Sequence, residues 1–140
     1  MRVVIDANVL VSAVISSAGP PRAVLTAWIE ERFELVASPA LLEELRGVLE
    51  RPKLRRYLSP GAAAGYLAGL GEDALIVADP PPMPGLTADP DDDYLVALAR
   101  AADADYVVSG DRHLLELADP EPPVLTPREF LALQENGADG

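Results

Sequence analysis

Carboxylates at four separate places in the sequence are the residues best suited to chemistry. Asp6 follows the apolar run 3–5, Asp111 comes soon after a second apolar run, and Glu44 interrupts an apolar helical pattern. Four further acids crowd into the five positions 89–93. Carboxylates held a few ångströms apart raise one another's pKa unless a cation neutralises them, and Mg²⁺ and Mn²⁺ prefer such oxygen ligands. A site of this kind positions water for in-line attack on a phosphodiester.

Each of these acids also has a purely structural interpretation. Asp6 and Asp111 could cap the helices that follow them, and the helix dipole favours acids in a first turn. One or two acids within the run 89–93 are explained in this way. Four acids repel one another and exceed what capping requires, which favours a functional role for part of the run.

Helical periodicity distinguishes neighbouring acids from one another. Asp92 shares a stripe with two apolar residues four and seven positions further on, so we expect it to point towards the core and keep Asp93 as the alternate. Glu44 lies within the apolar stripe of its own helix, which predicts an inward position near the edge of the sheet. Its neighbour Glu43 is predicted to be solvated.

Composition excludes several other kinds of site. The 140 residues include no cysteine and one histidine, which removes disulfides, thiolate zinc sites, iron–sulfur clusters, cysteine nucleophiles and His-rich metal sites. Any metal must therefore be bound through oxygen. The sequence has no glycine-rich phosphate loop and places no histidine base beside Ser109. The formal net charge of −12 argues against a protein that coats nucleic acid through bulk positive charge.

Short apolar strands alternate with helical patterns along the chain. Strands are predicted at 3–5, 33–37, 74–78, 106–108 and 124–125. Helices are predicted at 9–15, 22–32, 39–50, 60–70, 91–102, 112–117 and 127–134. This alternation is typical of βαβ units, so we expect an α/β fold whose central parallel sheet is covered on both faces. We expect one domain over 1–135 and a frayed tail over 136–140, with the active site beyond the carboxyl ends of the strands.

Four segments resemble the motifs of the PIN domain family, in the family's order and over nearly the whole chain. They are Val-Val-Ile-Asp6-Ala-Asn8, Ser38-Pro-Ala-Leu-Leu-Glu-Glu44-Leu, Asp89-Pro-Asp-Asp92-Asp-Tyr and Val-Val-Ser109-Gly-Asp111-Arg-His. Each motif is weak alone, and the four in succession are specific. The pattern is most similar to that of bacterial members that act as toxins of toxin–antitoxin pairs.

The resemblance implies a three-layer α/β/α sandwich and ribonuclease activity that depends on Mg²⁺ or Mn²⁺. The quartet that would be catalytic and bind the metal comprises Asp6, Glu44, Asp92 and Asp111, with Asp93 as the alternate for the third. Asn8 and Ser109 would be supporting groups that orient Asp6 or hold a water or phosphate. His113 stands where the family often has an acid, and we expect it to be a solvated turn residue or a weak phosphate contact.

The resemblance also implies partners. They are an RNA substrate, a small protein antitoxin and, as in many family members, a second copy of the chain. Leu25, Trp28 and Ile29 could form a dimer face, although packing in the core is the favoured interpretation. The basic residues Arg51, Lys53, Arg55 and Arg56 could position the RNA backbone beside the acids or form only a solvated face.

Several alternative functions stay open. The chain could be a catalytically inactive PIN-like interaction module, or a general RNA-processing nuclease outside a toxin–antitoxin pair. A phosphohydrolase with an aspartyl nucleophile is disfavoured, because it needs a second acid where Asn8 stands.

The sequence favours a cytoplasmic chain without a membrane segment. No apolar run approaches the roughly 20 residues that span a bilayer. Asp6 and Asn8 interrupt the apolar stretch that a secretory signal would need near the amino terminus.

Overall fold

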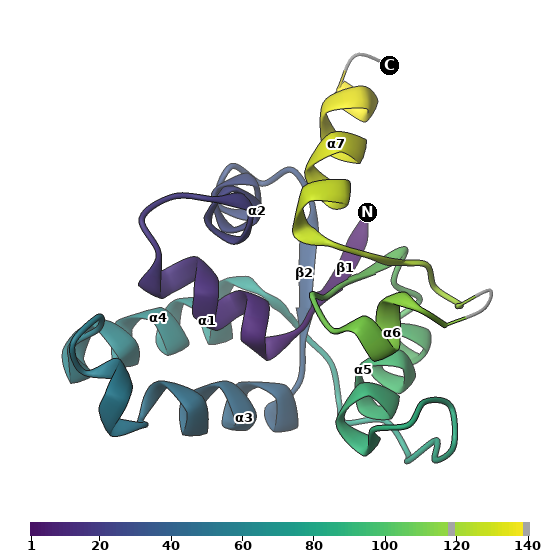
Figure 1. Ribbon diagram of the computed structural model, residues 1–140, viewed down its shortest axis with the longest axis horizontal. Helices are drawn as coiled ribbons and strands as arrows, with labels where there is room; N and C mark the ends of the chain where they lie inside the picture. The colour runs from purple at the N-terminus through teal and green to yellow at the C-terminus, as the bar shows by residue number, and fades with distance from the viewer. Residues whose placement is uncertain (118–119, 139–140) are drawn as a thin grey trace.

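The computed structural model describes residues 1–117 and 120–138, and their centre is a five-stranded parallel sheet (Figure 1). The strands are β1 (Arg2–Ile5), β2 (Glu34–Ala37), β3 (Leu75–Ile76), β4 (Tyr106–Val108) and β5 (Val124–Leu125). Their order across the sheet is β3-β2-β1-β4-β5, so the first strand of the chain is the central one. Val4 of β1 therefore pairs with Val36 of β2 on one side and Val107 of β4 on the other.

Helices connect these strands in the part of the chain that the structure describes. They are α1 (Ala7–Ile15), α2 (Pro20–Ile29), α3 (Pro39–Leu49), the short 3-10 helix η1 (Pro52–Leu54), α4 (Pro60–Asp73), α5 (Pro90–Ala101), α6 (Arg112–Leu115) and α7 (Pro127–Ala138). The predicted serine–proline starts are present in α3 and α4. Ser38 Oγ accepts a hydrogen bond from the N–H of Leu41 (3.2 Å), and Ser59 Oγ accepts one from Ala62 (3.1 Å).

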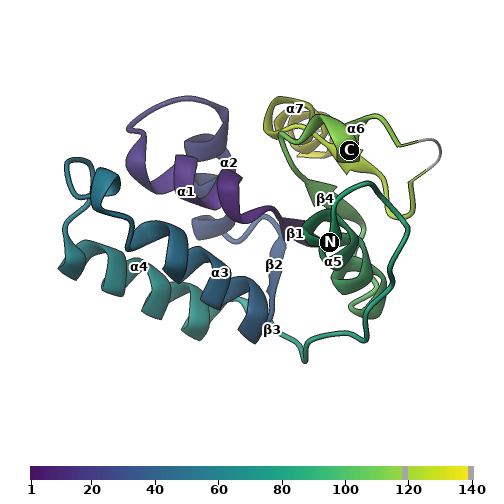
Figure 2. The same cartoon turned by 60° about the horizontal axis from the view of Figure 1, so that its bottom comes forward.

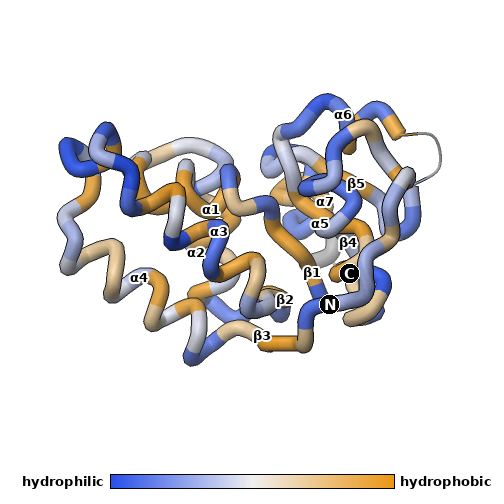
Figure 3. The backbone as a smooth tube through the Cα atoms, turned by 90° about the horizontal axis from the view of Figure 1, so that it is seen from below, coloured by the Kyte–Doolittle hydropathy of each residue, from blue (hydrophilic) through white to orange (hydrophobic). Residues whose placement is uncertain are grey.

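Alternation along the central strand builds two apolar layers. Val3 and Ile5 belong to the core shared with α1, α2, α3 and α4, whereas Val4 belongs to the opposite core shared with α5. Figure 2 shows α5 across the sheet from α1, α3 and α4, and Figure 3 shows β1 and β3 in hydrophobic colours. The predicted three-layer α/β/α arrangement is confirmed.

Several predicted elements differ from the observed ones in length. The helix predicted at 22–32 begins at Pro20 and ends at Ile29, because Glu31 adopts a left-handed φ of 60°. The strand predicted at 74–78 pairs only at Leu75 and Ile76, since its partner β2 ends at Ala37 and the chain then turns into α3.

The last helix extends into the segment predicted to be a frayed tail. Helix α7 was predicted to about residue 134 and extends to Ala138, so it overlaps the predicted frayed tail. Residues 139 and 140 lie outside the described residues.

Within the described ranges, no single helix is long and apolar enough to cross a bilayer. Helices α1 and α2 reach that length and composition only when taken together, and they are bent by 92° relative to each other. Both contribute buried side chains to the core, including Leu10 and Val24.

Candidate active site

Adjacent parallel strands bring Asp6 and Ser109 together at the carboxyl edge of the sheet. Ser109 Oγ donates a hydrogen bond to Asp6 Oδ2 (2.9 Å) and accepts one from the backbone N–H of Asp111 (3.0 Å). The N–H of Asn8 donates to Asp6 Oδ1 (3.1 Å). Asp6 and Ser109 are both buried, so this network fixes the Asp6 carboxylate in one orientation.

Three further carboxylates gather beside this network. One oxygen from each of Asp89, Asp92 and Asp111 lies within 4.8 Å of the others. Asp89 and Asp111 are the N-cap residues of α5 and α6, and Asp92 is in the first turn of α5. Two helix amino ends therefore point their acids at one place, and the helix dipole favours negative charge at each of them.

Asp92 is the least satisfied member of this cluster. Its side chain is buried, with 3% exposed, and its Oδ2 atom has no hydrogen-bond partner among the described residues. Burial is the main cause that raises the pKa of Asp92 to about 7, followed by the negative charges of Asp111 and Asp89. A buried, unpartnered carboxylate oxygen among other acids fits a divalent cation that prefers oxygen ligands.

Glu44 lies at the rim of the cluster and not within it. Its side chain is exposed, so the predicted inward position is wrong. The buried stripe of α3 is Leu41, Leu45 and Leu49, and Glu44 stands about 100° round the helix from Leu45. The pKa of Glu44 is nevertheless raised, first by partial desolvation and then by the charges of Asp91, Asp6 and Asp89, which indicates that it feels the acids of the site.

Asp93 has a different role from its neighbour Asp92. Its two oxygens accept hydrogen bonds from the backbone N–H groups of Gly85 (3.2 Å) and Thr87 (2.5 Å). Asp93 therefore fastens the loop that precedes α5, and it is not among the three acids that lie within 4.8 Å of one another.

Asp89 belongs to the cluster although sequence reasoning assigned it no role beyond a crowded helix start. Its Oδ1 caps α5 by accepting a hydrogen bond from the N–H of Asp91 (2.9 Å). A carboxylate that caps a helix through one oxygen retains a second oxygen for other contacts. The sequence signal for this role was the position of Asp89 at the N-cap of α5, two residues before the acid Asp91.

A cleft of about 350 Å³ opens beside Asp6 and Asp111. Its other lining residues include the uncharged Asn8, Ser12, Pro21 and Pro127. Asn8 and Ser12 are one turn apart on α1, and neither side chain forms a hydrogen bond with any residue described. Both can therefore contact a ligand that occupies the cleft.

His113 lies next to the acid Asp111, whereas the basic run lies at the far end of α3. The His113 side chain is exposed, and its backbone N–H donates to Asp111 Oδ1 (2.8 Å). The run Arg51–Arg56 surrounds η1, at the end of α3 that lies away from the sheet (Figure 1). Roughly 10 Å of helix rise separates Glu44 from Arg51, so the run begins about two helical turns from the rim of the cluster, and its contact with the RNA backbone stays a prediction.

The sheet is open and parallel, and carboxylates gather beyond the carboxyl ends of its central strands. These two features define a class of α/β proteins with an acidic site. The family model for the PIN domain matches residues 2–113, and the chain belongs to the PIN domain family. The family inferred from the four sequence motifs is therefore confirmed.

The chain is also similar to one protein of known sequence and to two solved structures, which share its fold. The chain is 29% identical to the uncharacterized protein MJ1680 of Methanocaldococcus jannaschii, over 94% of this chain and 90% of that protein. Among solved structures it is similar to VapBC2 from Rickettsia felis, described as bound to a DNA fragment from the promoter, with a TM-score of 0.62 and 16% identity. It is also similar to FitAcB from Neisseria gonorrhoeae, with a TM-score of 0.59 and 19% identity. Each match covers 90% of this chain and 98% of the other chain.

Proposed function

We propose that this PIN-domain protein is an endoribonuclease that depends on Mg²⁺ or Mn²⁺ and acts as the toxin of a toxin–antitoxin pair. The observation that carries the proposal is the buried, unpartnered Oδ2 of Asp92 in a cluster with Asp89 and Asp111. Such a cluster is unfavourable without a cation, and PIN domains are typically nucleases. A catalytically inactive interaction module would have no need to retain this arrangement.

The oxygen donors are suited to a hard divalent ion. Asp89, Asp92 and Asp111 would hold it, with Asp6 beside them and Glu44 at the rim. When bound, the ion neutralises the crowded carboxylates and stabilises the negative charge that develops on a phosphodiester during cleavage. The donor set contains no thiolate or imidazole, which favours Mg²⁺ or Mn²⁺ over softer metals.

The side chains around the cluster orient the reactants. Ser109 and the N–H of Asn8 hold Asp6, whose carboxylate orients a water molecule for attack on phosphorus. The bond from the water oxygen to phosphorus forms while the bond to the leaving ribose oxygen breaks; the water gives up one proton to the surrounding solvent, and the leaving ribose oxygen takes one up from it. The part of the cleft lined by the uncharged side chains of Asn8 and Ser12 receives the nucleotide next to the scissile phosphate.

Cleavage of a fluorescent single-stranded RNA tests the proposal. We expect cleavage in Mg²⁺ or Mn²⁺, none in EDTA, and a rate about 10²–10⁴-fold lower in Asp6→Asn and Asp92→Asn. Asp103→Asn is the matched control, because Asp103 is an exposed acid just after the same helix α5 and its φ of 52° suits asparagine. Equal rates in Asp92→Asn and the control would contradict the proposal.

Calorimetry separates a nuclease from an inactive scaffold. Titration of Mn²⁺ into the wild-type chain should give a binding heat that Asp92→Asn loses and Asp103→Asn retains. Absence of any metal-specific heat in the wild type would favour the interaction module.

The fold supports a protein antitoxin as the partner, because VapBC2 and FitAcB are toxin–antitoxin complexes. The chain should co-purify with, and be inhibited by, the product of a short reading frame beside its own gene. If no such product inhibits it, a general RNA-processing nuclease becomes the better assignment. A homodimer stays a prediction that light scattering can measure, and a cytoplasmic location accords with an RNA substrate.

A further inference from the structure

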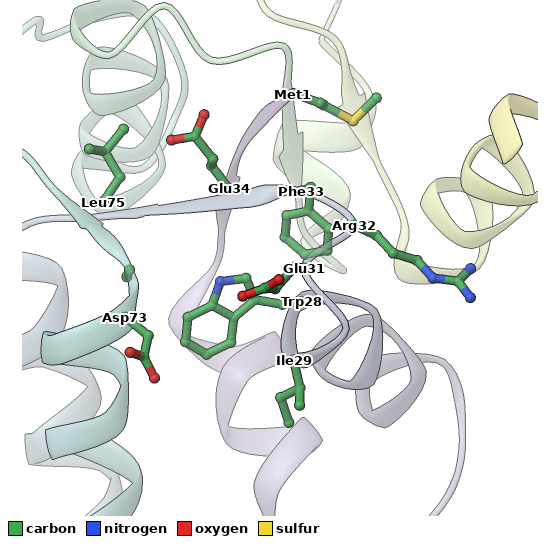
Figure 4. Close-up of a pocket in the computed structure, with 10 residues that line it drawn as sticks. Met1, Trp28, Ile29, Glu31, Arg32, Phe33, Glu34, Asp73 and Leu75 are labelled. Atoms are coloured by element: carbon green, nitrogen blue, oxygen red, sulfur yellow. The ribbon is translucent and has the colours of Figure 1, made fainter.

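A cavity of about 720 Å³ lies at the amino ends of β2 and β3, at the opposite edge of the sheet from the acidic cluster (Figure 4). It lies between the end of α2, the end of α4 and the first residues of both strands. Its lining includes Trp28, Ile29, Glu31, Glu34, Asp73 and Leu75.

Two helix carboxyl ends give this cavity a negative potential. Helix α2 ends at Ile29 and α4 ends at Asp73, and neither has a basic residue in its last turn. The free carbonyl groups of a helix end carry partial negative charge and are normally matched by lysine or arginine. At these two helix ends, acids occupy the positions where lysine or arginine is usual. They are Glu30 and Glu31 after α2, and Glu72 and Asp73 in α4.

The nearby cations do not compensate these acids. Arg32 pairs with Glu30 (3.4 Å), and Figure 4 shows its guanidinium directed away from the other lining residues. Arg2 lies 3.9 Å from Glu34. In the part of the chain that the structure describes, the carboxylates of Glu31 and Asp73 form no ion pair, so both are available to a cationic ligand.

An aromatic and apolar wall accompanies the charge. The indole of Trp28 lines the cavity, and in the view of Figure 4 it lies between Glu31 and Asp73. Arginine stacks on such rings through its guanidinium and covers apolar surface with its stem. Ile29 is 67% exposed at the same place, in contrast to Leu25 one turn earlier, which is buried.

We propose that this cavity binds an arginine side chain carried on a short basic segment of a partner protein. The carboxylates of Glu31 and Asp73 would pair with the guanidinium, and apolar neighbours of the arginine would cover Ile29. The exposed isoleucine favours a peptide over a small polyamine, because a polyamine has no apolar side chains to bury there. Tryptophan and arginine are also the residues most often dominant at protein interfaces.

This inference does not rest on the proposed nuclease function, because the cavity and the acidic cluster lie at opposite edges of the sheet. Substitutions in the cavity should leave metal-dependent RNA cleavage unchanged. Failure of one proposal is therefore distinguishable from failure of the other.

Trp28 provides the measurement, because it is the only tryptophan of the chain. The probe is an acetylated, amidated pentapeptide with alternating leucine and arginine, titrated while tryptophan fluorescence is recorded. We expect a saturable change with the wild type and a dissociation constant about two- to fivefold weaker in Asp73→Asn and in Glu31→Gln. The same peptide with glutamate in place of arginine should cause no change.

Glu43→Gln is the matched control, because it removes one exposed acid and the same unit of charge from α3. It should bind the arginine peptide as the wild type does. Equal weakening in Glu43→Gln would show an effect of net charge alone and would overturn the site. Spermidine that binds as tightly as the peptide, or a fluorescence change caused by the chain's own concentration, would overturn the choice of a partner protein.

Folding is not expected to confound the test. Both cavity variants remove an acid at or just beyond a helix carboxyl end, so they should fold at least as well as the wild type. Thermal unfolding checks this, and a wild-type fold without peptide binding in the wild type itself would refute the proposal.

Discussion

The two edges of the sheet place the same kind of residue in opposite electrostatic settings. At the carboxyl edge, Asp89, Asp92 and Asp111 stand at helix amino ends, where the dipole stabilises negative charge. At the amino edge, Glu31 and Asp73 stand at or just beyond helix carboxyl ends, where the dipole disfavours it. The first group is wholly or partly buried, whereas the second is exposed.

The difference shows that position relative to a helix end decides what an acid needs. The carboxyl-edge acids become unfavourable through crowding and, for Asp92, first of all through burial, and a small ion with oxygen ligands relieves both. The amino-edge acids are unfavourable even singly, and they border an open cavity with an indole. A large, weakly hydrated guanidinium suits that second setting better than a compact metal ion.

The largest expected effect concerns the network that holds Asp6. Ser109→Ala removes the hydroxyl that bridges Asp6 and Asp111, so the rate of RNA cleavage should fall about 10–100-fold, as for other groups that orient metal ligands. Ser59→Ala is the control, because it removes a serine hydroxyl that caps α4 far from the site. It should lower the free energy of unfolding by about 1 kcal/mol and leave the cleavage rate unchanged. Full activity in Ser109→Ala would show that Asp6 needs no such support.

A second expectation is a pH dependence of stability at the carboxyl edge. The pKa of Asp92 is about 7 in the folded protein against 3.8 ordinarily, so the native state binds an extra proton between these values. The free energy of unfolding of the metal-free protein should therefore fall as the pH rises from about 4 to 7, by on the order of 1–2 kcal/mol from this group.

Urea unfolding at pH 5 and pH 8 measures this dependence. The Asp92→Asn variant should lose that part of the slope, and Mg²⁺ added at pH 8 should stabilise the wild type more than the variant. Identical pH profiles for the two proteins would mean that Asp92 carries no such cost.

The smallest expected effects set the two edges directly against each other. Asp91→Asn removes an exposed acid from the first turn of α5, and Asp73→Asn removes one from the last turn of α4. The first should destabilise and the second should stabilise, each by about 0.3–1 kcal/mol at low salt. Thermal unfolding checks the signs, which 1 M NaCl should largely erase. Changes of the same sign would remove the basis of the comparison.

Local signals in the sequence were sufficient for most of the fold. Serine followed by proline marked the starts of α3 and α4, and the apolar runs marked the strands. Asp92 is buried, as its stripe predicted, but Asp93 is buried as well, because α5 packs on more than one face and the stripe alone does not separate the two acids. The class of fold followed from the alternation of these elements.

Other features depend on contacts that no local pattern reveals. Glu44 shares its apolar stripe with neighbours on the helix, yet α3 buries only the narrower line through Leu41 and Leu45. Asp89 joins the cluster only because the amino ends of α5 and α6 lie close together. The cavity at Trp28 forms only where two helix ends and two strands come together. Such juxtapositions are set by packing between elements distant in the sequence.

The hydrogen bond from Ser109 to Asp6 joins residues 103 positions apart, and this separation has a consequence for synthesis. The first strand leaves the ribosome early, but its neighbour β4 and both Ser109 and Asp111 emerge only after most of the chain. An incomplete nascent chain, or a fragment that stops before β4, lacks the groups that would complete the cluster. The acidic cluster can therefore form only after most of the chain has been translated, at about 5–20 residues per second.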